Sequence, residues 1–424
     1  MNQPPTSDSI LFNRVNLFDG KSESLIKNIN VLIEGNLISK ISSDVIDAPG
    51  AMVIDAGQDR FMTPGFIDAH AHLMFQLDMS QWLSADENYL AYVSTQAAKY
   101  YLHNGFTTIR DAAGNTFSLK KAIDQGIVEG PRVYPSGPLI SQTAGHADFR
   151  RDSHPSAQIA RETVPFMKYG HLAVADGRAE VLVAVREALR RGATQIKIAV
   201  GGGTASYCDP LDVVQYTADE ISAAVEAAAD WGTYVMAHVY NPRGIRRAID
   251  NGVKSIEHGN LVDQETLLYM KEKGVWLSPQ VKVYTFYPVG YNSEQMKKHD
   301  LAFSGIDHMF KTAKEIGFDK IVFGTDIVTD LQKVKDTNQE FILRGQWFTP
   351  VEVLRQATSV GAELLALSGN RNPYPGKLGV IEEGALADLL LINGNPLENL
   401  AILTEPQKNI ALVMKDGKIY KNIT

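Results

Sequence analysis

The chain has 424 residues, of which 44% are hydrophobic and 21% are charged, so it can bury a large core and lacks the composition of a disordered or fibrous protein. Its 41 Lys and Arg residues against 49 Asp and Glu residues leave a formal charge of −8, which argues against nucleic acid as a partner. The single cysteine, Cys208, excludes an intramolecular disulfide and a cysteine-based zinc cluster.

The first residues, MNQPPTSDS, are polar and have neither the charged start nor the apolar stretch of a signal peptide. No segment reaches the roughly 20 apolar residues of a membrane span. We therefore expect a soluble protein without a membrane partner. The compartment stays open between the cytoplasm and, after removal of a signal peptide, the periplasm or the cell exterior.

Short strands are predicted at both ends of the chain. Residues 8–62 contain three runs rich in Val, Ile and Leu that close on Gly or Asp. A similar pattern of short apolar runs recurs near the C-terminus, where Lys415, Asp416 and Gly417 have the pattern of a hairpin turn. We expect residues 1–62 and 376–424 to pair into one small β-sandwich.

Between these ends, residues 63–375 alternate strand-like apolar runs with helical patterns, which indicates βαβ units and a parallel sheet. The runs cover residues 64–72, 105–114, 132–141, 193–200, 233–239, 253–258, 275–280 and 321–326. Eight such runs predict an α/β protein with a (β/α)8 TIM barrel.

Helix starts are marked at three places by capping residues, namely Thr217 with Glu220, Asn241 with Pro242, and Thr349 with Pro350 and Glu352. Long segments without clear periodicity follow the third, fourth, seventh and eighth strands. In a barrel these loops lie over the C-terminal face, where active sites are built.

Five metal-competent residues fall at the ends of predicted strands. His70 and His72 are two residues apart, so both point to the same side of an extended strand. His238, His258 and Asp326 end three further strands. An isolated pair of histidines can equally be two exposed loop residues, and each of the others alone can be a core or rim residue. Together, the five predict a metal site.

Lys197 lies in the fourth predicted strand, within QIKIAV. The alternation there places Ile196, Ile198 and Val200 toward the helices and Lys197 toward the barrel interior. An unpaired ammonium is costly there and its pKa is expected to fall. The alternative is a buried ion pair with Asp or Glu. A neutral lysine can react with CO2 to form a carbamate, an anionic ligand able to bridge two cations.

This set of residues resembles the amidohydrolase superfamily. GFIDAHAH (65–72) is similar to the first-strand motif, Lys197 to the carboxylated bridging lysine, His238 and His258 to the fifth- and sixth-strand ligands, and Asp326 to the eighth-strand acid/base. The segments AHVYNPRGIRRAIDNGVKSIEHGN (237–260) and TAGHAD (143–148) resemble the imidazolonepropionase-related branch. That branch includes Xaa-Pro dipeptidase-like enzymes, Lys/Arg-type carboxypeptidases and ochratoxin-hydrolysing amidases.

The resemblance implies a binuclear hydrolase of the amide bond before a C-terminal amino acid, in a dipeptide or an N-acyl amino acid. It implies two divalent ions that share a hydroxide, with zinc expected first, although cobalt and manganese suit the same ligands. The more buried ion would be held by His70, His72 and Asp326, and the other by His238 and His258. Carboxylated Lys197 would bridge them, and Asp326 would carry the proton to the leaving amine.

Four residues are predicted to contact the substrate. His146 would donate a hydrogen bond to the oxyanion, or else be an ordinary loop histidine. Tyr240 and Arg243 follow His238 at the opening of a helix, where Arg243 could grip a carboxylate or form a surface salt bridge. Tyr207 lies in the loop after glycines 201–203, which suggest a tight turn beside the metals.

An aromatic stretch in the seventh loop is predicted to be either a pocket wall for a large apolar group or a packed lid. Its residues are Tyr284, Phe286, Tyr287 and Tyr291. As a pocket wall it would accommodate aromatic substrates, including ochratoxin-like amides. We assign no role to the remaining histidines, which are His103, His154, His171, His299 and His308.

Two other readings remain. One is a mononuclear deaminase or an imidazolonepropionase-like ring opener, which Lys197 and the lack of a Glu shortly after His238 disfavour. The other is a non-catalytic barrel used for assembly or binding, which the complete set of ligands disfavours. Relatives of this branch lead us to expect a homo-oligomer.

Overall fold

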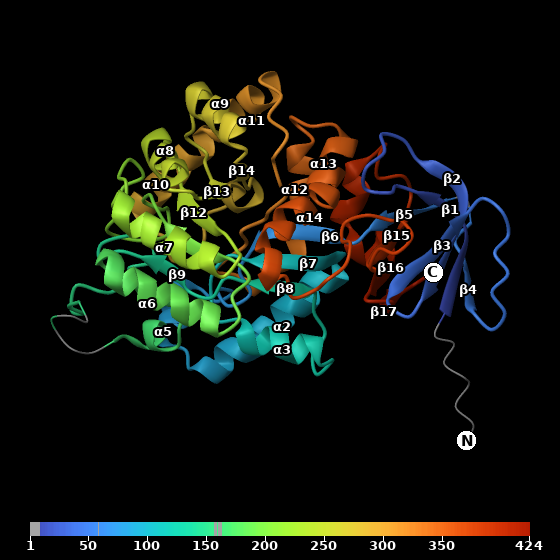
Figure 1. Cartoon of the computed structure of the whole chain (residues 1–424), viewed down its shortest axis with the longest axis horizontal. Helices are drawn as coiled ribbons and strands as arrows, with labels where there is room; N and C mark the ends of the chain where they lie inside the picture. The colour runs from blue at the N-terminus through green and yellow to red at the C-terminus, as the bar shows by residue number, and fades with distance from the viewer. Residues whose placement is uncertain (1–8, 58, 157–158, 160–162) are drawn as a thin grey trace.

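The computed structural model of the chain describes residues 9–424 except 58, 157–158 and 160–162. Figure 1 shows a barrel of strands surrounded by helices and, beside it, a sheet to which both ends of the chain contribute. In the described part of the chain, the helices are all too short or too polar to cross a membrane.

The eight predicted barrel runs form a parallel ring, although the eighth, residues 321–326, joins it through one parallel bridge and backbone hydrogen bonds and is not a regular strand. They are β6 (Phe66–Ala71), β7 (Phe106–Asp111), β8 (Arg132–Pro135) continued by β9 (Leu139–Ser141), β11 (Ile196–Ala199), β12 (Val235–Val239), β13 (Ser255–His258), β14 (Trp276–Ser278) and the segment 321–326. The ring closes where the N–H of Ala69 donates to Phe323 O and the N–H of Asp326 to His70 O, both at 2.8 Å. The α/β fold class with its TIM barrel is thus confirmed.

The third barrel strand differs from its prediction as one continuous run. Its first half, β8, pairs with β7, and its second half, β9, pairs with β11. Gly137 lies between them with a φ of +75°, a left-handed conformation that suits glycine. A short strand that the sequence pattern did not indicate, β10 (Leu172–Val174), pairs with the outer side of β9.

The helices cover the barrel with their apolar faces. In α7, the buried Ile221, Ala224 and Ala228 follow the i, i+3, i+7 spacing of such a face. The α-helices are α1 (Met79–Ser84), α2 (Glu87–His103), α3 (Phe117–Asp124), α5 (Pro165–Lys168), α6 (Gly177–Arg190), α7 (Ala218–Asp230), α8 (Pro242–Asp250), α9 (Gln264–Lys273), α10 (Ser293–Ser304), α11 (Ile306–Glu315), α12 (Gln339–Arg344), α13 (Pro350–Gln356), α14 (Ser359–Leu365) and α15 (Pro406–Asn409). Short 3-10 helices are η1 (Lys282–Thr285), η2 (Leu331–Asp336), η3 (Ala366–Arg371) and η4 (Leu400–Thr404).

The three predicted helix starts are confirmed, with capping boxes at Thr217 and Thr349 and an Asn241 side chain that accepts from Gly244 N. The segment after Thr349 is nevertheless two helices, because Thr358 leaves the helical conformation between α13 and α14. The break lies where the terminal sheet packs against the barrel: the Ser359 hydroxyl donates to Gly20 O at 2.6 Å.

The two ends of the chain form one eight-stranded sheet, in the order β17-β16-β15-β5-β1-β2-β3 with β4 beside β1. Its strands are β1 (Ser9–Leu17), β2 (Ile26–Glu34), β3 (Leu37–Ser42), β4 (Met52–Asp55), β5 (Arg60–Pro64), β15 (Leu389–Asn393), β16 (Ile410–Lys415) and β17 (Lys418–Asn422). Residues 1–8 of the expected unit lie outside the described residues, and β5 continues past residue 62. Asp416 and Gly417 both have positive φ in the turn between β16 and β17, as the predicted hairpin requires.

A buried ion-pair network joins this sheet to the start of the third barrel strand. Arg132 Nε lies 2.8 Å from Asp388 Oδ2, and Arg132 Nη2 lies 2.8 Å from Asp416 Oδ1. Nearby, Lys415 Nζ donates to Gly130 O at 2.6 Å. We call Arg132, Asp388, Lys415 and Asp416 the junction network.

Candidate metal centre and active site

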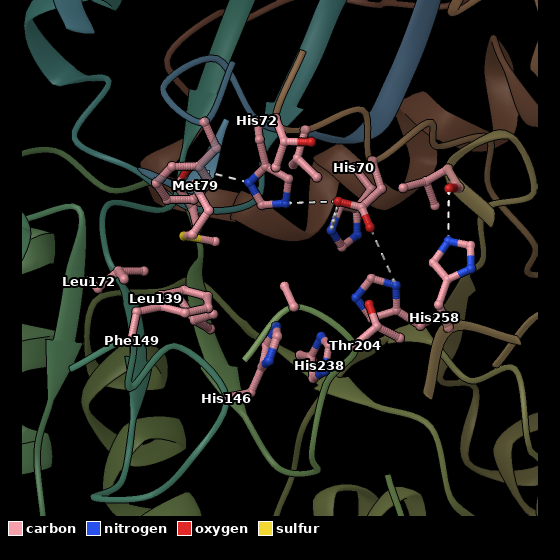
Figure 2. A pocket seen from close by; sticks show the side chains of 18 of the residues that line it. His70, His72, Met79, Leu139, His146, Phe149, Leu172, Thr204, His238 and His258 are labelled. Atoms are coloured by element: carbon pink, nitrogen blue, oxygen red, sulfur yellow. Dashed lines mark hydrogen bonds and ion pairs between the residues drawn. The ribbon is translucent and has the colours of Figure 1, made fainter. Parts of the chain in front are cut away.

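The six predicted metal ligands line a single cavity at the C-terminal ends of the barrel strands (Figure 2). His70 lies near the end of β6 and His72 just beyond it, Lys197 is in β11, His238 in β12 and His258 ends β13, while Asp326 ends the eighth strand. Six residues from five strands therefore meet because parallel barrel strands all end on the same face.

His70, His72 and Asp326 form the tightest group. Asp326 Oδ1 lies 3.1 Å from His72 Nε2 and 3.6 Å from His70 Nε2. One potential ligand atom from each of the three residues falls within 4.8 Å of the others. His258 approaches the same carboxylate from the other side, with Nδ1 3.8 Å from Asp326 Oδ2.

The backbone is strained at two of these positions. Asp326 has a φ of 52° and His258 a φ of 72°, so both adopt the left-handed conformation that non-glycine residues rarely adopt. Such outliers cost about 1–3 kcal/mol each and concentrate at functional sites.

Hydrogen bonds fix which nitrogen of His70 and His258 is free. His70 Nδ1 lies 2.7 Å from Glu257 Oε2, and His258 Nδ1 lies 2.7 Å from Gln280 Oε1. Because these oxygens accept, both Nδ1 atoms carry the hydrogen and both Nε2 atoms keep a lone pair. His70 Nε2 is buried and has no hydrogen-bond partner among the described residues.

His72 and His238 are oriented by backbone carbonyls in the same way. His72 Nδ1 lies 3.5 Å from Ala113 O, which turns Nε2 toward Asp326 Oδ1 at 3.1 Å, whereas His238 Nε2 lies 3.1 Å from Gly202 O, which leaves Nδ1 free. Metal-binding histidines characteristically donate their second ring N–H to such a partner. The four histidines therefore fit divalent cations in orientation as well as in position.

Their protonation state fits as well. Burial lowers the pKa of His70 to about 4 and the pKa values of His238 and His258 well below their usual range. These imidazoles are consequently neutral at pH 7, the form that binds metal. Burial alone would raise the pKa of Asp326, but the nearby histidines outweigh it and keep this carboxylate ionised.

Arg110 and Glu257 are functional-site residues that our sequence analysis missed. Arg110 Nη2 donates to both oxygens of Glu257, at 2.7 and 2.8 Å, and both side chains are completely buried. Glu257 in turn holds His70. The sequence did contain a sign of this pair. Arg110 and Glu257 each lie within a strand that is otherwise suited to burial, FTTIRD and SIEH, and a buried charge normally requires a partner.

Lys197 points into the cavity, as the strand alternation predicted, while Ile196, Ile198 and Val200 pack in the main core. No described carboxylate lies within 4 Å of its amine, so the predicted alternative of a direct ion pair is not seen. Burial lowers the pKa of Lys197 to about 8, so a sizeable fraction of the amine is neutral near physiological pH.

His146 also lines the cavity, where neighbouring residues pack closely around its ring. Its ring stacks on His238 with centroids 4.0 Å apart, and its Nδ1 lies 2.7 Å from Ser206 Oγ. A Cβ on Gly203 would lie 2.0 Å from this ring, and one on Gly202 would lie 1.9 Å from Pro210 O. Glycines 201–203 thus serve close approach beside the metal site, with negative rather than positive φ.

The remaining predicted substrate residues divide into two groups. Tyr240 lines the cavity, and its hydroxyl lies 2.8 Å from that of Tyr284. Arg243 instead is exposed on α8 and reaches Asp212 O at 3.4 Å, and Tyr207 is 52% exposed and lines a neighbouring surface groove. Adjacency to His238 along the chain did not bring Arg243 into the cavity, because it lies on the solvent side of the helix.

The apolar wall comes mainly from α1, β9, β10 and the loops beside them, and not from the predicted loop. Of the seventh-loop aromatics, Tyr284 and Tyr291 line the cavity, whereas Phe286 and Tyr287 do not. His299, to which we assigned no role, lines it too. Figure 2 shows Met79, Leu139, Phe149 and Leu172 on the side away from His258. We call this wall the apolar end, made of Phe75, Leu77, Met79, Trp82, Leu139, Phe149 and Leu172.

Comparison with known proteins shows which family the chain belongs to. The model of the Amidohydrolase family matches residues 61–420. The ochratoxinase of Aspergillus niger is 31% identical over 423 residues, covering 96% of this chain and 85% of that protein.

Among solved structures, a prolidase complexed with N-methylphosphonate-L-proline has a TM-score of 0.90 and 34% identity, covering 98% of this chain and 100% of that one. A Xaa-Pro dipeptidase with bound methionine in its active site has a TM-score of 0.85 and 32% identity over 98% of this chain and 100% of that one.

Proposed function

The chain belongs to the amidohydrolase family and is a hydrolase of carbon–nitrogen bonds, and from this premise we propose that it cleaves the amide bond between an apolar acyl group and a C-terminal amino acid. The observation that carries the proposal is the cavity itself. Four histidines, each oriented by a hydrogen bond of one ring nitrogen, and one ionised carboxylate face an apolar wall across the same space.

Two cations would be held as the resemblance implies. His70, His72 and Asp326 would bind one, His238 and His258 the other, and carboxylated Lys197 would bridge them. When bound, two divalent ions, zinc in the first place, would supply Lewis acidity and ionise water near neutral pH. The carbamate forms when the neutral Lys197 amine attacks CO2, which makes one N–C bond and releases one proton.

The chain's own residues then handle the proton and the developing charge. Asp326 is placed to accept a proton from the attacking water and to deliver it to the leaving nitrogen. His146 Nδ1 lies 2.7 Å from Ser206 Oγ and 3.4 Å from the buried Asp209 carboxylate, and these contacts hold the ring against His238, where its protonated form would donate to the carbonyl oxygen as it becomes negative. Asp326 remains ionised beforehand because the surrounding histidines hold its pKa low.

The apolar end suggests which substrates fit. Its side chains can remove an aromatic or branched acyl group from water, whereas a charged acyl group would lose its hydration there without a partner. The similar ochratoxinase and Xaa-Pro dipeptidase support substrates of this kind, namely N-acyl amino acids, ochratoxin-type amides and dipeptides with an apolar first residue.

A mass-spectrometric screen tests the proposal. The zinc-loaded protein is incubated with dipeptides, N-acyl amino acids and ochratoxin-type amides, with metal-stripped protein and Asp326→Asn as controls. We expect release of the C-terminal amino acid by the metal-loaded wild type alone, fastest with apolar acyl groups. Equal release by Asp326→Asn, or no release from the whole panel, would reject the proposal.

A further inference from the structure

The cavity has a polar wall in addition to its apolar end. The Tyr240 and Tyr284 hydroxyls lie 2.8 Å apart, and Thr204 Oγ1 lies 3.3 Å from the Tyr291 hydroxyl. The four residues come from the loops after β11, β12 and β14 and all line the cavity. We call Thr204, Tyr240, Tyr284 and Tyr291 the hydroxyl cluster.

In the described part of the chain, no lysine or arginine on the cavity side of this cluster is placed to receive a carboxylate. Lys298 lies beside Thr204 but outside the cavity lining, and its amine donates to Gly203 O and Ser206 O, both at 2.6 Å. Among the described residues, the cavity lining holds no arginine, and its single lysine, Lys197, lies in the metal centre. His299 behind the tyrosines donates through Nε2 to Val283 O at 3.2 Å, and burial lowers its pKa, so it is neutral. Arg243, the cation expected here from the sequence, is exposed outside the cavity.

Hydroxyl groups differ from an arginine in what they can bind. A guanidinium only donates, so it pairs with a carboxylate but cannot accept from the NH2 of a carboxamide. A hydroxyl both donates and accepts. The four hydroxyls form one chain, Tyr284–Tyr240–Thr204–Tyr291. Its three hydrogen bonds use three of the four O–H groups, which leaves one O–H and free lone pairs for a ligand. Such a wall can satisfy either terminal group.

We propose that the hydroxyl cluster binds the terminal group of the leaving amino acid through neutral hydrogen bonds, so that the enzyme accepts a C-terminal carboxamide as readily as a free carboxylate. The inference rests on the proposed amide hydrolysis and adds a substrate class to it, the N-acyl amino acid amides. Thr204, Tyr284 and Tyr291 thereby become specificity-determining residues together with Tyr240.

The experiment compares two substrates that differ only in the terminal group, N-benzoyl-L-phenylalanine and N-benzoyl-L-phenylalaninamide. Cleavage of the benzoyl amide releases benzoate from both, so one chromatographic assay measures both. With zinc-loaded wild-type enzyme we expect kcat/KM values within about tenfold of each other. A site that relied on a cation would lose about a hundredfold or more with the carboxamide, because its buried charge would be left unpaired.

Variants assign the effect to residues. Tyr291→Phe keeps the ring and removes one hydroxyl, and we expect about a tenfold lower kcat/KM for both substrates, the worth of one hydrogen bond. Tyr284→Phe should act similarly, with zinc content checked because this hydroxyl also lies 3.5 Å from His258 Nδ1. The matched control is Tyr287→Phe, whose hydroxyl bonds to Asp300 at 2.8 Å outside the cavity, and it should leave both rates unchanged. Thermal unfolding verifies that each variant is folded.

The inference is overturned if the carboxylate is preferred by a hundredfold or more, above all if Arg243→Ala abolishes that preference. It is also overturned if Tyr291→Phe changes neither rate. Should the wild type cleave neither substrate, the proposed function fails separately, and calorimetric binding of the same two compounds to the zinc-loaded protein decides the inference: similar affinities that fall in Tyr291→Phe support it, and binding of the carboxylate alone overturns it.

Discussion

Two regions that bury charged and ionisable side chains differ from each other: the candidate metal centre at the ends of the barrel strands and the junction network at the start of the third strand. In the junction network each charge has a partner, as Arg132 has in Asp388 and Asp416, and Lys415 in a carbonyl. In the candidate metal centre, by contrast, His70 Nε2 has no hydrogen-bond partner and Lys197 has no ion pair among the described residues.

This difference has an energetic meaning. A buried polar group without a partner costs about 1–3 kcal/mol, and in a cavity that cost is relieved when a ligand, a water molecule or an ion supplies the missing partner. A buried pair, by contrast, is strongly destabilising to break but contributes nothing chemical. The comparison predicts that substitutions in the metal centre change activity and leave stability nearly intact, and that substitutions in the junction network do the reverse.

The largest effect is expected for Asp326→Asn. The amide keeps the size of the side chain but can neither accept the proton of water nor serve as an anionic ligand, so turnover should fall by about a thousandfold or more. The free energy of unfolding of the metal-free protein should stay within about 1 kcal/mol of wild type. Steady-state rates and urea denaturation measure the two quantities, and a variant with more than a tenth of wild-type turnover would break the comparison.

Glu257→Gln should change both quantities, because Glu257 is paired with Arg110 and also orients His70. The uncompensated Arg110 should cost about 3–5 kcal/mol of unfolding free energy, and metal affinity should fall about 10- to 100-fold. Denaturation and competition with a chelator measure these effects. Glu272→Gln, which removes an exposed partner of Lys273, is the matched control and should do neither.

Arg132→Met should lower the unfolding free energy by about 3 kcal/mol, since it leaves Asp388 buried without its partner. The specific activity of the folded fraction should not change, because the junction network lies at the opposite end of the barrel strands from the cavity. The exposed Arg178→Met, which loses Asp219 and Glu226, should change stability by less than about 0.5 kcal/mol. Equal losses in both variants would show that burial does not matter at the junction.

The smallest effect is expected for Met79→Ala in the apolar end. Removal of this side chain should lower kcat/KM for an N-benzoyl amino acid by about tenfold and leave the N-acetyl analogue unchanged. The ratio of the two rates is the measurement. An equal decrease for both acyl groups would mean that Met79 supports the structure rather than the substrate.

The sequence predicted those parts of the molecule that depend on local pattern. Apolar runs, capping residues and the hairpin signal indicated all eight barrel strands, three helix starts and the β16–β17 turn, because each is encoded within a few neighbouring residues. The predicted metal ligands, His70 and Asp326 among them, line one cavity, as the rule of barrel geometry and the family resemblance led us to expect, while their role as ligands stays a prediction.

What the sequence did not predict depends on contacts between distant segments. The break at Thr358 occurs where Gly20 and Gly379 pack against the helix, and the Arg110–Glu257 pair joins residues 147 positions apart. Arg243 was misplaced for a related reason: its position in the chain beside His238 says nothing about which face of α8 it occupies. Side chains such as Leu172, in the short strand β10, and Phe149, in the loop after β9, line the cavity at positions that periodicity does not indicate.

The pairing of β5 with β15 has a consequence for how the protein is made. Arg60 and Asn393 are neighbours in this sheet although 333 residues separate them. At about 5–20 residues per second, a ribosome needs roughly 20 to 70 s to synthesise the segment between them. During that time the backbone groups of β5 that later pair with β15 remain unpaired and accessible to other chains. A nascent chain released before β15 would therefore expose an aggregation-prone edge that only the full-length product covers.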